Sequence, residues 1–253
     1  GRRRRQSCIR DSSTVVVPVY GYARQDKKHR GREPISARLM ADLFKTAGAN
    51  RLMTVDLHTS QIQGFFDGPV DHLFALPLLA QHVASKVDGS KITVVSPDAG
   101  RVRVAERWTD VLGAPLAIIH KRRDPDIPNQ VRVLEVVGDV KDRVCVVVDD
   151  MIDTGGTIVK ASETLFENGA SQVIVAATHA ILSDPARERL QNSNISDVIV
   201  TDTLPIAGER RFDKLTVLSI APLLATAINE VFTDGSVTRM FEDEDFGRHT
   251  SSH

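Results

Sequence analysis

The fold is decided by residues 144–157, which read Val144-Cys145-Val146-Val147-Val148-Asp149-Asp150-Met151-Ile152-Asp153-Thr154-Gly155-Gly156-Thr157. The five apolar residues at its start are typical of a strand that is covered on both faces, as in a parallel sheet. Two acidic residues follow at the carboxyl end of the strand, and a glycine-containing turn then leads into a helical pattern. We therefore predict an α/β fold with mainly parallel sheets.

The turn at residues 153–157 has the composition of a phosphate-binding loop. Glycines let backbone N–H groups approach a phosphate closely, and the start of a helix adds positive potential. Asp149 and Asp150 repel phosphate, but they can accept hydrogen bonds from sugar hydroxyls or hold a cation. We predict a ribose phosphate site here. The alternative is a glycine-rich turn with an acidic cap, which is common in doubly wound folds.

Short β-branched runs alternate with amphipathic segments along most of the chain, as expected for repeated βα units. The predicted strands are residues 14–19, 51–55, 92–96, 116–120, 143–148, 172–177, 197–200 and 215–219. The predicted helices are residues 35–47, 77–86, 102–112, 157–168 and 222–232. We predict a first domain at 1–75, a second at 76–234, and a return segment with a polar tail at 235–253.

The composition narrows the class of protein. The 253 residues include 32 basic and 33 acidic side chains, so nucleic acid is disfavoured as a partner. No apolar run reaches the roughly 18 residues of a membrane span, and the basic start lacks the apolar segment of a secretory signal. Cys8 and Cys145 are far apart in the sequence and are expected to be reduced. We expect a cytoplasmic protein.

Polar residues that suit nucleotide and metal binding follow two strands in the first half of the chain. Arg24-Gln25-Asp26 brings a guanidinium for phosphate and an amide for a base edge. Asp56 and His58 alternate around one leucine, so both can point to the same side of the strand end. The alternatives are a solvated charged turn for the first group and a structural histidine for the second.

A basic corner lies at residues 121–123, Lys121-Arg122-Arg123, and is followed by a proline-broken segment. Cations on such a segment can close over a triphosphate and neutralise the charge that develops during phosphoryl transfer. From the residues alone, a solvated basic corner is an equally good reading.

Several motifs together resemble the ribose-phosphate pyrophosphokinase family, whose members make phosphoribosyl pyrophosphate from ATP and ribose 5-phosphate. The loop at 148–157 alone would also fit a phosphoribosyltransferase, whereas Arg24-Gln25-Asp26 and Asp56-Leu57-His58 make the resemblance specific. It extends from about Val15 to Phe241. The other matching segments are residues 34–37, 61–67, 96–100, 120–123 and 138–140.

The resemblance implies two phosphoribosyltransferase-like domains, a pyrophosphoryl transfer and a homohexamer. Its catalytic residues correspond here to Lys121 and Arg123, and its ATP-binding residues to Arg24, Gln25 and Asp26. The ribose 5-phosphate site corresponds to Asp149, Asp150, Asp153, Thr154, Gly155, Gly156 and Thr157. A Mg²⁺ cofactor is implied, with Asp56, His58, Asp67, Asp71 and Asp98 as its candidate ligands.

The amino-terminal end departs from the family pattern. Residues 1–14 do not resemble the strands and helices with which family members begin, so we expect the first domain to be incomplete. Two other functions stay open: a non-catalytic regulatory or binding subunit of the same family, and a salvage phosphoribosyltransferase. The second would need a base-binding hood and would have no use for Arg24-Gln25-Asp26.

Overall fold

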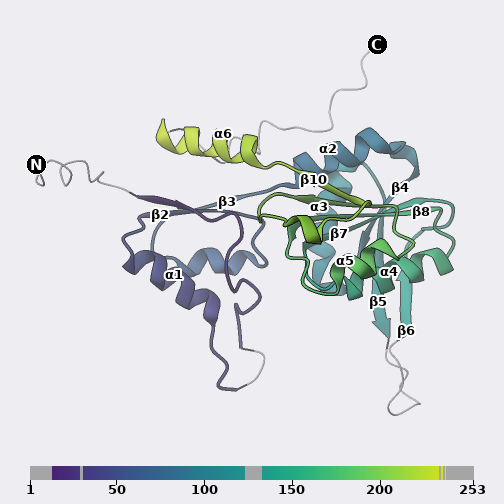
Figure 1. Ribbon diagram of the computed structural model, residues 1–253, viewed down its shortest axis with the longest axis horizontal. Coiled ribbons are helices and arrows are strands. Elements are labelled where there is room, and N and C mark those ends of the chain that lie inside the picture. The colour runs from purple at the N-terminus through teal and green to yellow at the C-terminus, as the bar shows by residue number, and fades with distance from the viewer. Residues whose placement is uncertain (1–12, 29–30, 123–132, 234, 236, 238–253) are drawn as a thin grey trace, which may run out of the picture. The chain divides into compact units, whose positions relative to one another are not determined.

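The protein is described by a computed structural model that covers residues 13–28, 31–122, 133–233, 235 and 237. The chain divides into two compact units, Gly1–Phe74 and Ala75–His253 (Figure 1). Each unit contains a sheet with helices packed against it, so the predicted α/β class is confirmed. Among the described helices, none combines the length and the apolar character of a membrane span.

Unit 1 is built on a three-stranded parallel sheet in the order β1-β2-β3. Its elements are β1 (Thr14–Val16), α1 (Ser36–Thr46), β2 (Arg51–Val55), the 3₁₀ helix η2 (Ser60–Phe65) and β3 (Val70–Leu73). Strand β2 is central, and all but its first residue are buried. A central position suits its Leu-Met-Thr-Val sequence, since each face of the strand is covered.

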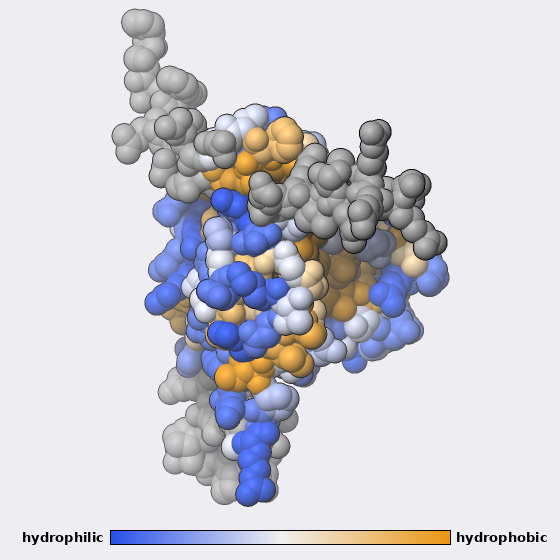
Figure 2. Space-filling view, turned by 90° about the vertical axis from the view of Figure 1, so that its left-hand side faces the viewer, coloured by the Kyte–Doolittle hydropathy of each residue, from blue (hydrophilic) through white to orange (hydrophobic). Residues whose placement is uncertain are grey.

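Unit 1 has a small core and an exposed apolar stripe. Helix α1 turns the small residues Ala37 and Ala41 inward, which lets it lie close to the tyrosine ring of Tyr20 and its neighbours. Leu39 and Leu43, one turn apart on the same helix, are 57% and 51% exposed. Figure 2 shows apolar patches between charged areas on one side of the molecule. Exposed apolar stripes on a surface helix suit packing against another protein surface.

Unit 2 contains a seven-stranded sheet in the order β10-β9-β8-β7-β4-β5-β6. All neighbouring strands are parallel except β5 and β6. The strands are β4 (Ile92–Ser96), β5 (Leu116–Arg122), β6 (Val133–Val137), β7 (Val144–Ile152), β8 (Gln172–Ala180), β9 (Asp197–Thr201) and β10 (Leu215–Leu218).

Helices of unit 2 lie on both faces of this sheet. Those that pack on it or on one another are α2 (Leu76–Lys86), α3 (Val102–Leu112), α4 (Gly156–Glu167) and α5 (Ala186–Gln191), whereas α6 (Ala221–Phe232) follows β10 and buries only Ala227. The chain moves in one direction along the sheet through β4-α3-β5 and in the opposite direction through β7-α4-β8. Because such crossovers are right-handed, α3 and α4 lie on opposite faces.

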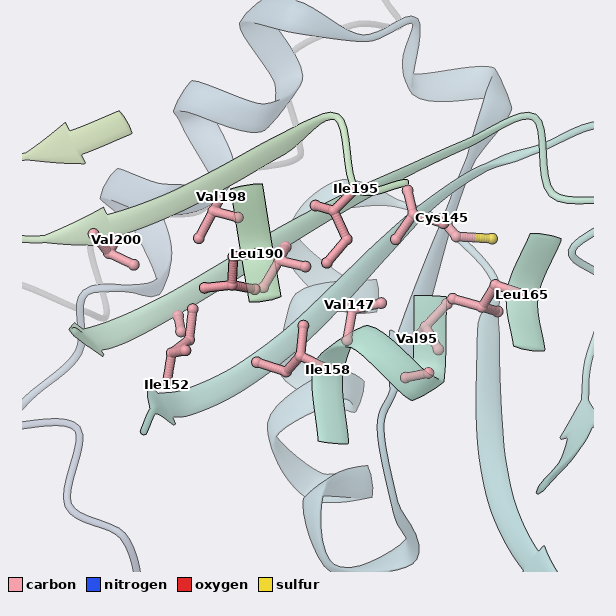
Figure 3. Packing of buried hydrophobic residues seen from close by; sticks show 14 of the residues in the cluster. Val95, Cys145, Val147, Ile152, Ile158, Leu165, Leu190, Ile195, Val198 and Val200 are labelled. Atoms are coloured by element: carbon pink, nitrogen blue, oxygen red, sulfur yellow. The ribbon is translucent and has the colours of Figure 1, made fainter. Parts of the chain in front are cut away.

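The core of unit 2 gathers on β7 and its neighbours. Val147, Ile158, Leu165 and Leu190 belong to one buried cluster, which Figure 3 shows between the sheet and the helices α4 and α5. Cys145 also lies in this cluster as a free thiol, and burial raises its pKa to about 12. A thiol with so high a pKa is an inert core residue.

Several elements differ from the prediction for physical reasons. Strand β1 ends at Val16 rather than at residue 19, since Pro18 has no N–H to donate to the ladder. Strand β7 continues to Ile152, so Asp149 and Asp150 belong to the strand itself. The sequence did not predict β3, β6 or α5. Apart from residues 235 and 237, the predicted tail lies outside the described residues.

Candidate functional site

The candidate site lies where the strand order of unit 2 reverses. Strands β4 and β7 are neighbours, with Val95 paired to Val147, but the chain leaves them in opposite directions toward β5 and β8. Loops that leave two such strands diverge and open a crevice at the carboxyl edge of the sheet, which is where open α/β sheets bind ligands. The loop after β4 contains Asp98, and the loop after β7 is residues 153–157.

The loop after β7, residues 153–157, has the backbone of an anion cradle. Gly155 has a φ of +72°, in the left-handed region, and is the N-cap residue of α4. Gly156 is the first residue of that helix, so the helix starts inside the loop. The first N–H groups of a helix have no partners within it, and they carry the positive end of its dipole. The loop is therefore suited to a phosphate group.

The loop after β4 is a short 3₁₀ turn that is capped by Asp98. The carboxylate of Asp98 accepts the N–H of Gly100 at 2.8 Å, and its carbonyl oxygen accepts the hydroxyl of Ser96 at 2.7 Å. This geometry fixes the start of α3 and the position of Arg101, the last residue of the turn. The turn thus presents one acidic and one basic side chain at the switch point.

Arg101 joins the two loops through the acidic pair at the end of β7. Its Nε lies 3.1 Å from Oδ1 of Asp149, and its Nη2 lies 2.9 Å from Oδ1 of Asp150. All three side chains are at most 19% exposed, so water screens these ion pairs only weakly. The guanidinium therefore compensates two neighbouring negative charges that would otherwise repel each other.

The ionised form of Asp149 is destabilised even with Arg101 beside it. Burial raises the pKa of Asp149 well above its ordinary value, and the hydrogen bond and negative charge of Asp150 raise it further. The Arg101 charge and the Asp150 backbone N–H, which Asp149 accepts at 2.8 Å, act in the opposite direction. A polyol ligand would offset this destabilisation, since sugar hydroxyls donate hydrogen bonds to carboxylates.

The chain as a whole is similar to proteins named ribose-phosphate pyrophosphokinase. It is 71% identical to the protein of that name from Streptomyces avermitilis over 233 residues, which cover 92% of this chain and 72% of the relative. This chain belongs to the ribose-phosphate pyrophosphokinase family. The protein of the same name from Mycobacterium tuberculosis is 62% identical over 232 residues, which cover 91% of this chain and 71% of the relative.

Family models and a solved structure agree with this membership. Residues 4–48 match the N-terminal domain of ribose phosphate pyrophosphokinase, and residues 119–242 match the phosphoribosyl synthetase-associated domain. The first match begins at residue 4, ahead of Val15, where the sequence motifs begin. The crystal structure of phosphoribosylpyrophosphate synthetase from Mycobacterium smegmatis has a TM-score of 0.82 and 58% identity, and the match covers 89% of this chain and 73% of that one.

In this member of the ribose-phosphate pyrophosphokinase family, the three predicted ATP-binding residues play different parts in unit 1. Arg24 and Gln25 are exposed in a turn before α1. Asp26 is buried, and its Oδ2 accepts the Thr59 hydroxyl at 2.6 Å and the Gln61 amide at 2.7 Å. Asp26 therefore ties this turn to the start of η2, whereas its two neighbours are accessible to a ligand.

The predicted metal ligands are not gathered into one cluster by the described residues. Within that part of the chain, no group of three or more His, Cys, Asp or Glu side chains is placed to hold a metal ion. Asp71 is bound elsewhere, because both of its carboxylate oxygens lie 2.9 Å from Nη1 of Arg51. Asp98 belongs to unit 2, and Asp56, His58, Asp67 and Asp71 belong to unit 1. The metal set stays a prediction.

The two predicted catalytic residues lie at and beyond the end of β5. Lys121 is the penultimate residue of the strand and pairs with Leu134 of β6, whereas Arg123 lies outside the described residues. The backbone of Lys121 stands three residues beyond Ile118, the partner of Ser96 in β4. At about 3.3 Å per residue, this carries it about 10 Å past the edge of β4.

Two arginines that contact the loop at 153–157 or the acidic pair before it were not predicted from the sequence. Arg101 follows Asp98-Ala99-Gly100 directly, so its place at the end of a predicted site motif was a usable signal. Arg189 lies on α5, which is only six residues long and too short to show a helical period. Its Nη1 donates to the carbonyl oxygen of Thr154 at 3.2 Å.

Two glycines at opposite ends of α4 give a matched test of the loop. Gly155 has a φ of +72° and Gly169 a φ of +88°, and a β-carbon on either would lie 3.2 to 3.3 Å from a neighbouring side chain. We expect alanine at either position to lower the free energy of unfolding by about 1–2 kcal/mol, the cost of the left-handed conformation.

Only the loop variant is expected to affect ligand binding. Gly155→Ala should weaken ribose 5-phosphate binding about 10-fold, a change of about 1.4 kcal/mol, because the loop backbone must shift. Gly169→Ala should bind as the wild type does. Denaturant unfolding and calorimetric titration measure the two effects, and equal weakening by both variants would contradict the assignment of the loop.

Proposed function

We propose that this chain transfers the pyrophosphoryl group of ATP to the C1 hydroxyl of ribose 5-phosphate and so makes 5-phosphoribosyl 1-pyrophosphate and AMP. The observation that carries the proposal is the pairing of an anion-binding loop with buried acceptors of hydroxyl hydrogen bonds at the switch point of unit 2. Membership of the ribose-phosphate pyrophosphokinase family supports the same reaction.

Ribose 5-phosphate is assigned to unit 2. Residues 153–157 bind its phosphate through backbone N–H groups and threonine hydroxyls. Asp149 and Asp150 accept hydrogen bonds from its ring hydroxyls, and Arg101 holds both carboxyl groups in place through contacts of 3.1 and 2.9 Å. Holding the sugar at both ends orients C1, which lowers the entropic part of the barrier.

ATP is assigned to the exposed residues Arg24 and Gln25, with Asp26 as the buried support of their turn. In the transfer, the C1 oxygen forms a bond to the β-phosphorus while the bond from that phosphorus to the α,β-bridging oxygen breaks, and AMP leaves. Lys121 and Arg123 stabilise the negative charge on the transferring group. Positioning and electrostatics suffice, so no covalent enzyme intermediate is formed.

Mg²⁺ is the proposed cofactor, and the available donors fit it in part. Carboxylate oxygens, as at Asp56, Asp67 and Asp98, are the ligands that Mg²⁺ prefers, and the bound ion neutralises charge on the nucleotide phosphates. The imidazole of His58 is a less usual ligand. Asp71 can take part only if its ion pair with Arg51, at 2.9 Å, opens.

A cytoplasmic homo-oligomer is also part of the proposal, with a hexamer as the family resemblance implies. The exposed stripe of Leu39 and Leu43 on α1 supports contact between copies, because water-exposed leucines one turn apart gain free energy when they are covered. Light scattering of the purified chain measures the molar mass. A strictly monomeric protein at micromolar concentration would contradict this part.

The reaction is tested by a coupled assay for AMP release from ATP and ribose 5-phosphate over a range of Mg²⁺ concentrations. We expect AMP from the wild type. Asp153→Ala should raise the KM for ribose 5-phosphate about 10-fold, as for the loss of a charged hydrogen bond, while the KM for ATP stays within about twofold. Asp110→Ala is the control, since it removes the same charge from an exposed position on α3.

The other outcomes separate the remaining functions. Ribose 5-phosphate binding without AMP at any Mg²⁺ concentration would rule out the enzyme and favour a regulatory subunit. Transfer of a phosphoribosyl group to a free base would favour a salvage phosphoribosyltransferase.

A further inference from the structure

Helix α5 lies directly behind the phosphate-binding loop. The guanidinium Nη1 of Arg189 donates to the carbonyl oxygen of Thr154 at 3.2 Å. The next residue, Leu190, is fully buried, and its Cγ would lie 3.3 Å from a β-carbon on Gly155. Two consecutive residues of α5 therefore contact two consecutive residues of the loop, which lie 35 positions earlier in the chain.

The contact with Thr154 also determines where the next N–H points. The Thr154–Gly155 peptide is trans and planar, so the Thr154 carbonyl and the Gly155 N–H point in opposite directions. Because the Thr154 carbonyl faces Arg189 on α5, the Gly155 N–H is directed away from α5. Gly155 is the N-cap residue of α4, and the N–H groups at the start of a helix have no acceptor within that helix, so this N–H can face an anion.

Arg189 also adds charge where an anion is expected. A β-carbon on Gly156 would lie 3.4 Å from its Nη1, so the positive group stands next to the first turn of α4. The other arginine of α5, Arg187, points its Nε to the carbonyl oxygen of Arg211 at 3.1 Å and makes no such contact with the loop. The same helix thus carries one arginine on the loop and one away from it.

We propose that Arg189 is a positioning residue for the sugar phosphate, which fixes the Thr154–Gly155 peptide so that the Gly155 N–H is aimed at the 5-phosphate. The inference rests on the proposed function, since it assumes that residues 153–157 bind ribose 5-phosphate. Arg189 is exposed, so its hydrogen bond contributes little to folding and its substitution leaves the fold intact.

The test compares Arg189→Gln, Arg189→Lys and Arg187→Gln in the full chain. Calorimetric titration with ribose 5-phosphate should give a Kd raised about 5- to 20-fold for Arg189→Gln, as for the loss of part of a charged hydrogen bond. Arg189→Lys keeps the charge and a donor, so it should restore part of the affinity. Arg187→Gln should stay within about twofold of the wild type, because it removes the same charge from the same helix.

Steady-state kinetics separate positioning from a structural role. For Arg189→Gln we expect a higher KM for ribose 5-phosphate, with kcat and the KM for ATP unchanged, whereas partial unfolding would lower kcat in proportion to the active fraction. An unchanged Kd in Arg189→Gln, or an equal rise in both glutamine variants, would overturn the inference. A wild type that binds ribose 5-phosphate but releases no AMP would instead overturn the proposed function, since the titration still tests Arg189.

Discussion

Lys121→Ala is expected to lower kcat about 100- to 1,000-fold, the usual cost of removing one group that stabilises charge in the transition state. Ribose 5-phosphate binding should stay within about twofold of the wild type, because its assigned residues lie on the loop after β7 and not on β5. Single-turnover kinetics with ATP and ribose 5-phosphate measure the chemical step directly.

Strand β5 carries the backbone of Lys121 past the end of β4. Strands β5 and β6 pair beyond the edge of β4, with Lys121 opposite Leu134, so the antiparallel pair projects from the carboxyl edge of the sheet, as Figure 1 shows. The backbone of Lys121 therefore lies on a different element of unit 2 from the loop at 153–157. When a residue contributes binding energy only in the transition state, its removal lowers kcat and leaves the affinity for substrate unchanged.

Lys91→Ala is the matched control for this prediction. Lys91 is exposed at the start of β4, on the amino edge of the same sheet, so its loss changes the net charge equally. We expect its kcat to equal that of the wild type. Unchanged turnover in Lys121→Ala, or an equal decrease in both variants, would show that Lys121 has no catalytic role.

Arg101→Met is expected to lower the free energy of unfolding by about 3 kcal/mol at neutral pH and to weaken ribose 5-phosphate binding. Removing one partner of a buried ion pair leaves the other charge uncompensated, and here two carboxylates lose the same counter-charge. Arg103→Met is the control, since Arg103 is exposed on the same helix. Denaturant unfolding at several pH values measures both variants.

The sign of the pH dependence follows from Asp149. Its pKa is raised in the folded protein, chiefly by burial, so between the unfolded and folded pKa values the folded state binds more protons. The free energy of unfolding therefore falls as pH rises through this window. Without Arg101 the folded pKa rises further, and the window extends to higher pH.

The difference between Arg101→Met and the wild type should consequently grow as pH rises. This difference should be smallest near the ordinary aspartate pKa of about 4, where the Asp149 carboxyl group, with its raised pKa, is neutral in the folded protein. Asp149→Asn in the Arg101→Met background should recover part of the lost stability at neutral pH. A deficit that does not change with pH would show that the ion pairs are not its cause.

The parts of the fold that could be predicted are those whose pattern is local. Residues 92–96 were predicted as a strand and are β4, because a buried parallel strand is apolar at every position. Strand β3 escaped prediction because its Asp71 and His72 are polar. The structure satisfies them with partners far along the chain: Arg51 binds Asp71, and the His72 Nε2 accepts the Leu57 N–H at 2.9 Å.

In the candidate site, too, the local features could be predicted and the contacts between distant residues could not. The loop at 153–157 could be predicted because its two glycines are adjacent in the sequence, and glycine adopts the backbone conformations that a tight turn needs. Arg101 contacts Asp149 from 48 residues away and Arg189 contacts Thr154 from 35 residues away, and neither contact follows from local sequence. The strand order that brings β4 beside β7 had to be known before these side chains could be placed.

The tryptophan and the tyrosines, whose optical signals can report unfolding, lie in different units of the chain. The sequence has one tryptophan, Trp108, which is 3% exposed on α3 in unit 2, and two tyrosines, Tyr20 and Tyr22, both in unit 1. Tyr20 donates its hydroxyl to the Ala37 carbonyl at 2.8 Å, and burial raises its pKa to about 12. Indole fluorescence therefore follows the unfolding of unit 2, and the ultraviolet absorption of ionising Tyr20 at alkaline pH reports the opening of unit 1. One denaturant series read at both chromophores reveals whether the units unfold together or in succession.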